Sequence, residues 1–359
     1  MNIWIDIYHI PQLNYYVHFI DMLNKEGHTI YVTILDRGRL VKIAKKELAQ
    51  YEHVKLYVIG KHRMKRWSVL LEANLLRCIC LFFWALFKRI DISFSNGFQH
   101  GFIAILKRFP AYSFHDDPDA SDHKLMDIFC TRDHALLYQL PNGRELHKKD
   151  ILMPCLKEWA MLSPTYFSPH VEALDVYGVR PKEYIFLREV SVGTFNYASQ
   201  ERGAIRNVIP AIERLRTFKG DKMSVLFSLE EKHRRNEYPE DWILLQEPVQ
   251  EVHSLIYYAA GLVSSGDSMA REAAELGIPA YYLGSRYSMP ANIAASKVAN
   301  LQNEITMPFS EWIKGLEKST IELIDGQDRL RKKLNEEFLD INEYMHSLVV
   351  ERERELKKS

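Results

Sequence analysis

Three side chains capable of acid–base chemistry follow apolar stretches in the first half of the chain. His9 lies after the apolar stretch Asn2–Tyr8, and His115 and Asp116 lie after Tyr112–Phe114. An imidazole with its ordinary pKa of about 6.5 accepts a proton at neutral pH, and a carboxylate can accept one or orient a histidine. The sequence therefore predicts His9 as the first candidate for a general base, with His115 and Asp116 as the alternatives. Each of them is also compatible with a hydrogen-bonding role without catalysis.

A run of small residues in the second half has the form of a ligand-binding loop. Residues 261–283 predict a short apolar strand, the loop Ser264–Ser268, a helix that ends near Gly277, and a second strand after Pro279. Small residues let a backbone turn tightly and bring its N–H groups close to a ligand, and ligands bind at the carboxyl edge of parallel strands. The same pattern also fits an ordinary strand–turn–helix unit that binds nothing.

This stretch carries a resemblance to a known superfamily. Its Ser-x-Gly, the later Glu-Ala and the closing Gly-x-Pro resemble the donor-nucleotide motif of GT-B glycosyltransferases and UDP-N-acetylglucosamine 2-epimerases. The chain most closely resembles the domain of unknown function (DUF) 354 family, through this motif, the opening MNIWIDIYHIPQ and the segment YIFLRE at 184–189. The resemblance covers nearly the whole chain. It implies an α/β protein of the GT-B fold, with two Rossmann-like domains whose parallel sheets face each other across a cleft.

The resemblance also assigns the donor-binding residues. It implies that the small-residue loop meets the diphosphate and the sugar, and that a glutamate binds the ribose hydroxyls. On this chain those positions are Ser264, Ser265, Gly266, Asp267, Ser268 and Glu272.

Further donor contacts are expected at the ends of other predicted strands. Arg188 follows Tyr184–Leu187, where a guanidinium can pair bidentately with phosphate oxygens, although a salt bridge to Glu189 or another neighbour is the alternative. Glu247 and Val249 stand where GT-B proteins contact the base. Arg286, in the loop 285–289, is a second candidate cation or a solvated side chain.

We expect no metal cofactor. Asp117, Pro118 and Asp119 spell the DxD pattern of the other glycosyltransferase fold, but a proline between two carboxylates is typical of a turn. The pair also lies far along the chain from the predicted diphosphate site. Arg188 and helix N-termini would meet the diphosphate charge instead.

The alternation of predicted strands and helices indicates two domains. We expect an N-terminal Rossmann-like acceptor domain at 1–163, a linker at 164–181, a C-terminal donor domain at 182–328, and a helical segment at 329–359 that can cross back to the first domain. The first predicted loop lacks G-x-G-x-x-G, so a dinucleotide site is not expected there.

Residues 61–90 combine a basic cluster with a long apolar run. Lys61, Arg63, Lys65 and Arg66 precede Trp67, and Cys78–Phe87 is apolar throughout. Basic residues beside aromatic ones suit a helix lying in the surface of an anionic membrane leaflet. The alternative is a helix that covers the sheet and is buried on most sides.

Composition narrows the setting of the protein. The 359 residues contain 47 basic and 47 acidic side chains, which gives no reason to expect nucleic-acid binding. Four cysteines lie in apolar surroundings and are predicted to be buried free thiols. No signal peptide and no run of about 20 apolar residues is present. We therefore expect a cytoplasmic protein, peripheral on the inner face of the cytoplasmic membrane.

These observations lead to one function and two alternatives. The first is a metal-independent glycosyltransferase that moves a sugar from a nucleotide-diphosphate donor, expected to be a UDP-sugar, to a lipid-linked or surface-glycan acceptor in polysaccharide, capsule or cell-envelope synthesis. The second is a nucleotide-sugar 2-epimerase that uses carboxylates and a histidine. The third is a non-catalytic sugar-nucleotide-binding subunit of a polysaccharide assembly complex, because Ser264 and Ser265 precede Gly266 where many relatives have a glycine pair.

Overall fold

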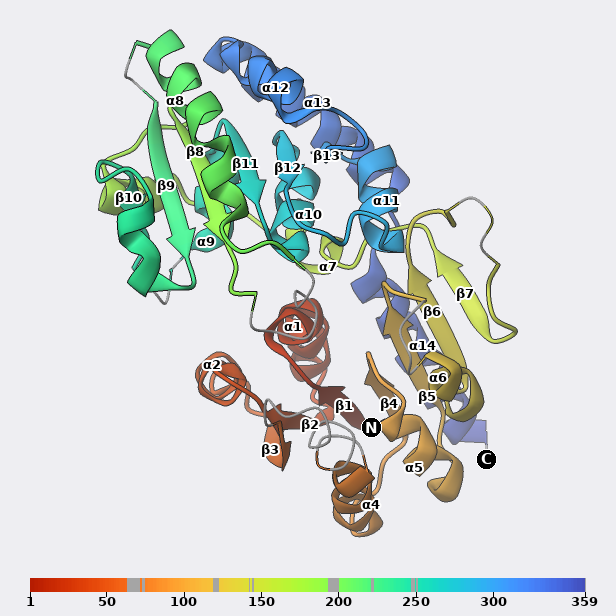
Figure 1. Cartoon of the computed structure of the whole chain (residues 1–359). Helices are drawn as coiled ribbons and strands as arrows, with labels where there is room; N and C mark the ends of the chain where they lie inside the picture. Colours follow the sequence, from red (N-terminus) through yellow and green to blue (C-terminus); the bar gives the residue numbers. More distant parts are fainter. Residues whose placement is uncertain are drawn as a thin grey trace. The chain divides into compact units, whose positions relative to one another are not determined.

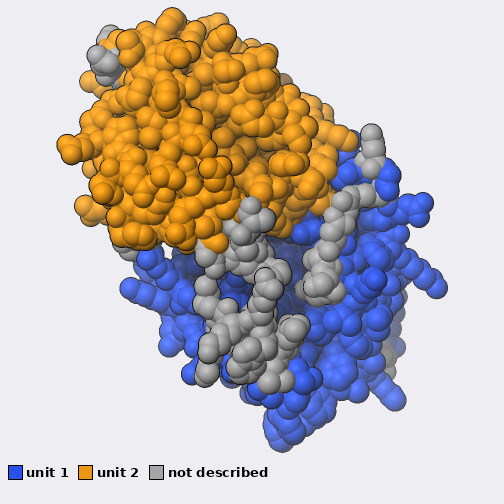
Figure 2. All heavy atoms as spheres, in the orientation of Figure 1, with its two compact units in different colours: residues 1–161, 339–359 blue, residues 162–338 orange. Residues whose placement is uncertain are grey.

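The computed structural model describes residues 1–62, 72, 75–118, 123–141, 143, 145–192, 200–220, 223–246, 249 and 251–358 (Figure 1). The chain forms two compact units, which Figure 2 colours separately. Unit 1 comprises residues 1–161 and 339–359, and unit 2 comprises residues 162–338. The expected linker at 164–181 lies within unit 2, and residue 329, the expected start of the C-terminal segment, lies inside a helix of unit 2.

Unit 1 is built on a parallel sheet of order β3-β2-β1-β4-β5-β6-β7. Its interior strand β1 is buried along nearly all its length, as expected for a parallel sheet covered on both faces. The strands are β1 (Asn2–Ile7), β2 (Thr29–Asp36), β3 (Val54–Lys61), β4 (Ile92–Ser95), β5 (Ala111–His115), β6 (Arg132–Leu136) and β7 (Asp150–Met153).

The helices of unit 1 follow its strands along the chain. The first of them begins with Pro11 in its opening turn and ends before Gly27, whose φ of 75° suits a residue without a Cβ. The helices are α1 (Ile10–Lys25), α2 (Leu40–Leu48), α4 (Arg77–Leu86), α5 (Gln99–Lys107), α6 (His123–Phe129), α7 (Trp159–Leu162), which ends at the unit boundary, and α14 (Ile341–Lys358).

The C-terminal helix α14 belongs to the packing of unit 1. It contacts α1, and the Asn342 side-chain amide donates to the carbonyl of Ala160 at 2.7 Å. The Tyr344 hydroxyl lies 3.1 Å from Nε2 of His134 on β6. Because these partners are far away in sequence, α14 closes one side of the unit after the chain has passed through unit 2.

Unit 2 repeats the same strand order with a smaller sheet. Its order is β10-β9-β8-β11-β12-β13, and all these strands are parallel. The strands are β8 (Tyr184–Glu189), β9 (Ser224–Leu229), β10 (Ile243–Leu244), β11 (Gly261–Ser264), β12 (Ala280–Tyr282) and β13 (Leu301–Gln302).

The helices of unit 2 include several short 3₁₀ turns, marked η. They are η2 (Val171–Tyr177), η4 (Ala204–Val208), α8 (Ile209–Phe218), η5 (Lys232–Glu237), α9 (Val252–Tyr258), α10 (Asp267–Glu275), α11 (Pro290–Val298), α12 (Phe309–Trp312), η6 (Ile313–Glu317) and α13 (Thr320–Glu337). One core cluster joins the sheet to α8, α12 and η6 through large aromatic side chains, among them Phe227, Trp242, Tyr281 and Trp312.

Two expectations about residues 61–90 need correction. Helix α4 is not buried on most sides: Leu81 and Ala85 are fully buried, whereas Phe83 and Phe87 are 58% and 86% exposed. The four cysteines are free thiols, but only Cys130 and Cys155 are buried, whereas Cys78 is half-buried and Cys80 is exposed. None of the described helices combines the length and the apolar composition that a bilayer crossing requires.

Candidate functional site

The small-residue loop of unit 2 is held in place by hydrogen bonds of its own residues. The Ser264 hydroxyl donates to the carbonyl of Gly266 and accepts from the backbone N–H of Gly266 at 3.0 Å. The Ser265 hydroxyl accepts from the backbone N–H of Val190, and the Gln200 side chain donates to the Ser265 carbonyl at 2.9 Å. These contacts fix the loop between β11 and α10 at the carboxyl end of the sheet, where α/β folds bind ligands.

Helix α10 begins directly after this loop and lies close to the sheet. Ala270, Ala273 and Ala274 are fully buried, and α10 contacts both β11 and β12. The helix is followed by Gly277, whose φ is 83° and where a Cβ would lie 2.8 Å from the carbonyl oxygen of Gln327. A residue with a side chain would therefore be strained at this turn. The predicted strand–loop–helix–strand unit is present with its close packing.

The first turn of α10 carries a buried acidic group with a cationic partner. Asp267 Oδ2 lies 2.9 Å from Nη1 of Arg286 and 3.7 Å from Nη1 of Arg271. Arg271 donates to the Asn292 side-chain oxygen at 2.8 Å, and the Asn292 amide donates to the carbonyl of Arg286. Arg286, a predicted donor contact, is therefore held beside the N-terminus of α10, where the helix dipole favours anions.

Glu272 lies on the face of α10 that meets the neighbouring helix α9. Its side chain is 11% exposed, and its Oε2 lies 3.4 Å from Nε2 of His253 in the first turn of α9. Val249, three residues before α9, is half-buried. The structure thus places the predicted ribose-binding carboxylate beside the helix whose start was predicted to meet the base. Glu247 lies outside the described residues.

Arg188 has an acidic partner within unit 2. Its Nη1 donates to the Ser228 hydroxyl at 2.7 Å, and its Nη2 forms an ion pair with Glu230. Glu230 also accepts from the backbone N–H of Ser191 at 2.9 Å. The partner is therefore Glu230 and not the adjacent Glu189. A phosphate that engaged Arg188 would have to displace or share this carboxylate.

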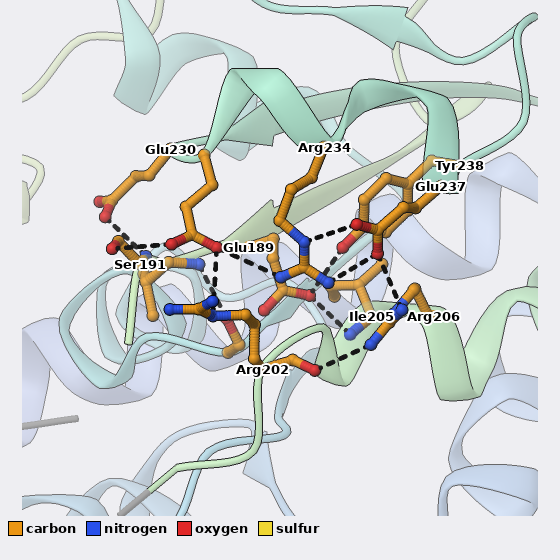
Figure 3. Close-up of polar contacts among 12 residues, drawn as sticks. Glu189, Ser191, Arg202, Ile205, Arg206, Glu230, Arg234, Glu237 and Tyr238 are labelled. Atoms are coloured by element: carbon orange, nitrogen blue, oxygen red, sulfur yellow. Dashed lines mark hydrogen bonds and ion pairs between the residues drawn. The ribbon is translucent and has the colours of Figure 1, made fainter. Parts of the chain in front are cut away.

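An arginine–glutamate network surrounds this pair at the ends of β8 and β9 (Figure 3). The Arg234 guanidinium donates to both carboxylate oxygens of Glu237, at 2.7 and 2.6 Å, and Arg206 pairs with the same carboxylate at 2.8 Å. Glu189 is 2% exposed and accepts from the backbone N–H of Ile205 at 2.8 Å. Burial raises the pKa of Glu189. The network fixes the loops on the carboxyl side of the sheet.

Unit 2 contains a cavity of about 600 Å³ on the same loops. Gln200, which bonds to the Ser265 carbonyl, lies in its wall together with Leu283, Gly284 and Ser285. The last of these residues belongs to the loop 285–289 after β12, which also carries Arg286, a predicted donor contact. A cavity of this size is in the range of small-molecule sites.

Unit 1 contains a smaller polar pocket that gathers the predicted acid–base residues. Its volume is about 150 Å³, and its lining includes His9, His115 and Asp116. They come from the ends of β1 and β5, which are separated in the sheet by β4. Parallel strands bring their carboxyl ends to one edge, so residues far apart in sequence meet there. The lining also contains Asp117 and Lys157.

The electrostatics of this pocket differ from the sequence expectation. The pKa of His9 is lowered to about 3, first by burial and then by the positive charges of Lys157 and Arg37. The charge of Asp116 raises the pKa of His9. Asp116 also forms an ion pair with Lys157, whose Nζ lies 2.5 Å from Asp116 Oδ2. His9 is therefore neutral at neutral pH, and its pKa is well below that of an ordinary histidine.

His115 has a different environment from the other candidates. Its Nε2 lies 2.9 Å from Nε2 of His123, the first residue of α6, and 3.8 Å from Oδ2 of Asp133 on β6. Burial, followed by the charge of His123, lowers the pKa of His115 to about 3. His115 is thus part of a buried histidine–aspartate group, which the sequence did not predict.

Several predicted residues fall elsewhere. Lys61 is exposed at the last position of β3. Arg63, Lys65, Arg66, Trp67 and Asp119 lie outside the described residues, so the structure does not describe the basic cluster beyond Lys61.

Four residues that contact the predicted site residues were not predicted from the sequence. Three of them, Lys157, Glu230 and His253, lie in no recognisable sequence motif, and only the strand order brings them to Asp116, Arg188 and Glu272. His123 begins a short helix after Asp117-Pro118, so extending the strand-end argument to the next element would have found it.

Two units with parallel sheets and the strand order of Rossmann folds define a class of protein, the GT-B fold. A UDP-GlcNAc 2-epimerase from Neisseria meningitidis bound to UDP-GlcNAc matches over 100% of both chains, with a TM-score of 0.67 and 15% identity. A putative UDP-N-acetylglucosamine 2-epimerase from Listeria monocytogenes matches over 95% of this chain and 93% of that chain, with a TM-score of 0.66 and 12% identity.

A glycosyltransferase has the same architecture. The spinosyn rhamnosyltransferase complexed with thymidine diphosphate matches over 97% of this chain and all of that chain, with a TM-score of 0.58 and 12% identity. No protein-family model and no curated protein sequence matches the chain. The GT-B prediction is therefore confirmed as a fold, and the closer resemblance to the DUF 354 family stays a prediction.

Proposed function

We propose that unit 2 binds a nucleoside diphosphate sugar and that the protein transfers this sugar to an acceptor hydroxyl. The observation that carries the proposal is the pairing of Glu272 on α10 with His253 at the start of α9, one turn of helix beyond the small-residue loop. In this assignment Glu272 accepts hydrogen bonds from the ribose hydroxyls. The backbone of the loop and the N-terminus of α10 receive the diphosphate.

The charges around the loop support a diphosphate ligand. Arg286 lies beside the first turn of α10, and Arg188 stands at the end of the neighbouring strand β8. Both are held by carboxylates, so each guanidinium is already oriented before a ligand arrives. A bidentate contact from either one would neutralise charge on the leaving diphosphate as the bond to the sugar breaks.

We assign the acceptor and its proton acceptor to the pocket of unit 1. The acceptor oxygen would bond to the anomeric carbon of the sugar, its proton would pass to His9 or Asp116, and the nucleoside diphosphate would leave with the electron pair of the broken bond. The pKa of His9 is low because of burial and the charges of Lys157 and Arg37. An anionic group bound in the pocket of unit 1 would raise that pKa by its negative charge and make the imidazole a better base.

An exposed apolar face on α4 and α5 supports a lipid-linked acceptor. We define the α4–α5 face by its exposed side chains, which are Ile79, Phe83, Leu86, Phe87, Phe102, Ile105 and Leu106. The two helices contact each other, and the exposed residues Arg89 and Arg108 follow their C-terminal ends. Contiguous exposed apolar side chains mark interaction sites, and basic residues at their border suit an anionic leaflet. The proposed acceptor is a glycolipid presented at the inner membrane face.

The function is tested by product analysis with defined donors. The purified chain is incubated with radiolabelled UDP- and dTDP-sugars and a membrane lipid extract, and the lipid phase is analysed for sugar. We expect Glu272→Ala to abolish transfer, because Glu272 is assigned to donor binding. His9→Ala should lower the rate of transfer and leave donor affinity unchanged, because His9 is not assigned to donor binding. Sugar transfer that is unchanged in Glu272→Ala would contradict the assignment.

A 2-epimerase is the second candidate, supported by the acidic lining of the unit 1 pocket. His9, Asp116 and Asp117 surround one small polar space, as chemistry at a sugar carbon with several proton transfers requires. Incubation with UDP-N-acetylglucosamine alone separates the two functions. Formation of the manno epimer without any acceptor would establish the epimerase, and its absence beside glycolipid formation would exclude it.

A further inference from the structure

Four side chains that the proposed function does not use meet in the interior of unit 1. We define the His–Asp cluster as His115, His123, Asp133 and Asp150. They come from four consecutive elements: the end of β5, the start of α6, the second residue of β6 and the first residue of β7. One donor atom from each residue lies within 4.8 Å of all the others.

The spacing of these atoms is that of a ligand shell. Nε2 of His123 lies 2.9 Å from Nε2 of His115, 3.3 Å from Oδ2 of Asp133 and 3.6 Å from Oδ2 of Asp150. Nε2 of His115 lies 3.8 Å from Oδ2 of Asp133. Four ligands at about 2.0–2.1 Å from a tetrahedral zinc ion are about 3.3 Å apart. The four printed distances, 2.9 to 3.8 Å, lie on both sides of that value, and the donor atoms are all within 4.8 Å of one another.

Outer hydrogen bonds aim the carboxylates at the histidines. Oδ1 of Asp133 accepts from the Ser113 hydroxyl at 2.6 Å and from the backbone N–H of His134 at 3.0 Å, and its other oxygen is directed to the histidine pair. Oδ2 of Asp150 accepts from the backbone N–H of His147 at 3.1 Å. Such second contacts typically orient metal-binding side chains.

Burial of the two carboxylates would destabilise the folded chain if no cation neutralised them. The side chains of Asp133 and Asp150 are 0% and 1% exposed. Oδ1 of Asp150 has no hydrogen-bond partner among the described residues, and a buried carboxylate oxygen without a donor is destabilising.

We propose that the His–Asp cluster is a zinc site with four protein ligands. Imidazole nitrogen with carboxylate oxygen in a four-coordinate set suits zinc, whereas magnesium and calcium prefer six or more oxygen ligands. Four protein ligands leave no position for a substrate, so the ion is structural. It joins α6 to the three strands at one edge of the sheet and so holds the wall of the polar pocket, which both histidines line.

No metal was expected from the sequence, because Asp117-Pro118-Asp119 is typical of a turn and lies far along the chain from the predicted diphosphate site. The zinc ligands are instead spread over residues 115 to 150 without a recognisable spacing, and only the parallel order β5-β6-β7 brings them together. The proposal does not depend on the proposed function, because it concerns residues that are not assigned to the donor or the acceptor chemistry, apart from the alternative role of His115.

The test is metal binding by the full chain. The protein is stripped with a chelator, and zinc is titrated in competition with a chromophoric chelator, with cobalt absorption as a second readout of tetrahedral coordination. We expect about one zinc per chain and a loss of affinity of more than about 100-fold in Asp133→Asn and His123→Ala. Zinc should also raise the thermal unfolding midpoint of the wild type and not that of the variants.

A buried histidine outside the cluster supplies the matched control. His100 is fully buried on α5 and its Nδ1 lies 2.9 Å from the Ser93 hydroxyl, so His100→Asn removes an interior imidazole without touching the four ligands. This variant should bind zinc as the wild type does. Wild-type protein that binds zinc no more tightly than Asp133→Asn, with both folded by circular dichroism, would overturn the proposal and leave a proton-sharing cluster in its place.

Discussion

His9 shows how an environment changes the chemistry of a residue whose position the sequence predicted. An ordinary imidazole in a loop would titrate near neutral pH. In unit 1, burial and the charges of Lys157 and Arg37 oppose its protonation, and the carboxylate of Asp116 is shared with Lys157. A base role therefore needs the negative charge of a substrate to complete the pocket.

This shift predicts an acid sensitivity of folding. The pKa of His9 is about 3 in the folded chain and about 6.5 when unfolded, so the unfolded chain binds more protons between these values. The free energy of unfolding therefore falls as the pH falls from about 6.5 towards about 3. His9→Asn should lessen that fall in urea unfolding series at several pH values. His170→Asn, whose ring is 61% exposed, is the control and should behave as the wild type. If the free energy of unfolding depended on pH equally in His9→Asn and in the wild type, the assigned role of His9 in acid sensitivity would be wrong.

The Arg188–Glu230 pair gives a second prediction for single residues. If Arg188 binds the diphosphate, Glu230→Gln should tighten binding of a nucleoside diphosphate, because the guanidinium loses its competing carboxylate. Arg188→Gln should weaken binding by about tenfold or more. Isothermal titration with UDP and dTDP measures both.

A matched control for this pair lies in the same network. Glu237→Gln removes a carboxylate that pairs with Arg234 and Arg206 but not with Arg188. It should leave nucleotide affinity unchanged. An Arg188→Gln protein with full affinity would show that Arg188 serves only the network.

A buried ion pair joins helix α4 to β1, beside the apolar packing of Leu81 and Ala85 in the core of unit 1. Arg77, fully buried, donates to both carboxylate oxygens of Asp6 on β1, at 2.9 and 2.5 Å, and its Nε donates to the carbonyl of Ile59. Gly60 lies against this side chain, since a Cβ there would be 2.9 Å from Cδ of Arg77. The charge pair thus orients α4 so that its opposite face is apolar and exposed.

Breaking this pair should destabilise the protein strongly. Arg77→Leu leaves the carboxylate of Asp6 buried without its cation, which costs about 3–5 kcal/mol of unfolding free energy. Arg89→Leu removes a side chain that is 78% exposed and pairs with Asp91, and should cost less than about 1 kcal/mol. Denaturant unfolding measures both variants. Equal losses would mean that the buried pair does not hold α4.

The α4–α5 face predicts binding to anionic membranes. Phe83→Asp should reduce co-sedimentation with phosphatidylserine or cardiolipin vesicles by at least about tenfold, because inserting a phenylalanine contributes about 1.5–3 kcal/mol. Ile321→Asp, at a site on α13 that is 71% exposed, is the control for adding a charge to an exposed apolar position. Vesicle binding that is equal in both variants would remove the face from the membrane role.

The elements differ in how far the sequence predicted them. The stretch 261–283 was predictable because strand, loop, helix and strand each carry their own local signal, and Gly277 ends the helix as expected. The exposed face of helix α4 was not predictable, because an apolar run such as Cys78–Phe87 does not show which of its sides faces the core and which faces solvent. The side that α4 buries depends on partners distant in sequence, namely Asp6, which pairs with Arg77, and the apolar cluster around Leu81 and Ala85. The partners Lys157, Glu230 and His253 were missed for the same reason.

The whole chain contains one sheet architecture twice, with different side chains at the strand ends of the two units. Both units have three strands in descending order on one side of the sheet and ascending order on the other. Unit 2 carries the small-residue loop and its arginines, and unit 1 carries the polar pocket and the His–Asp cluster. A shared fold therefore does not give the two units a shared role, and function depends on side chains at the strand ends.

The most direct test of the account is the titration of the full chain with UDP, dTDP and the corresponding nucleosides, for wild type and Glu272→Ala. We expect a nucleoside diphosphate to bind, the nucleoside alone to bind more weakly, and Glu272→Ala to lose about 10- to 100-fold in affinity, as expected for removal of a charged hydrogen-bond acceptor. Glu311→Ala, which removes an exposed glutamate from α12, should bind as the wild type does. Absence of nucleotide binding by folded wild-type protein, or equal affinity in Glu272→Ala, would contradict the central claim that unit 2 is a nucleotide-sugar site.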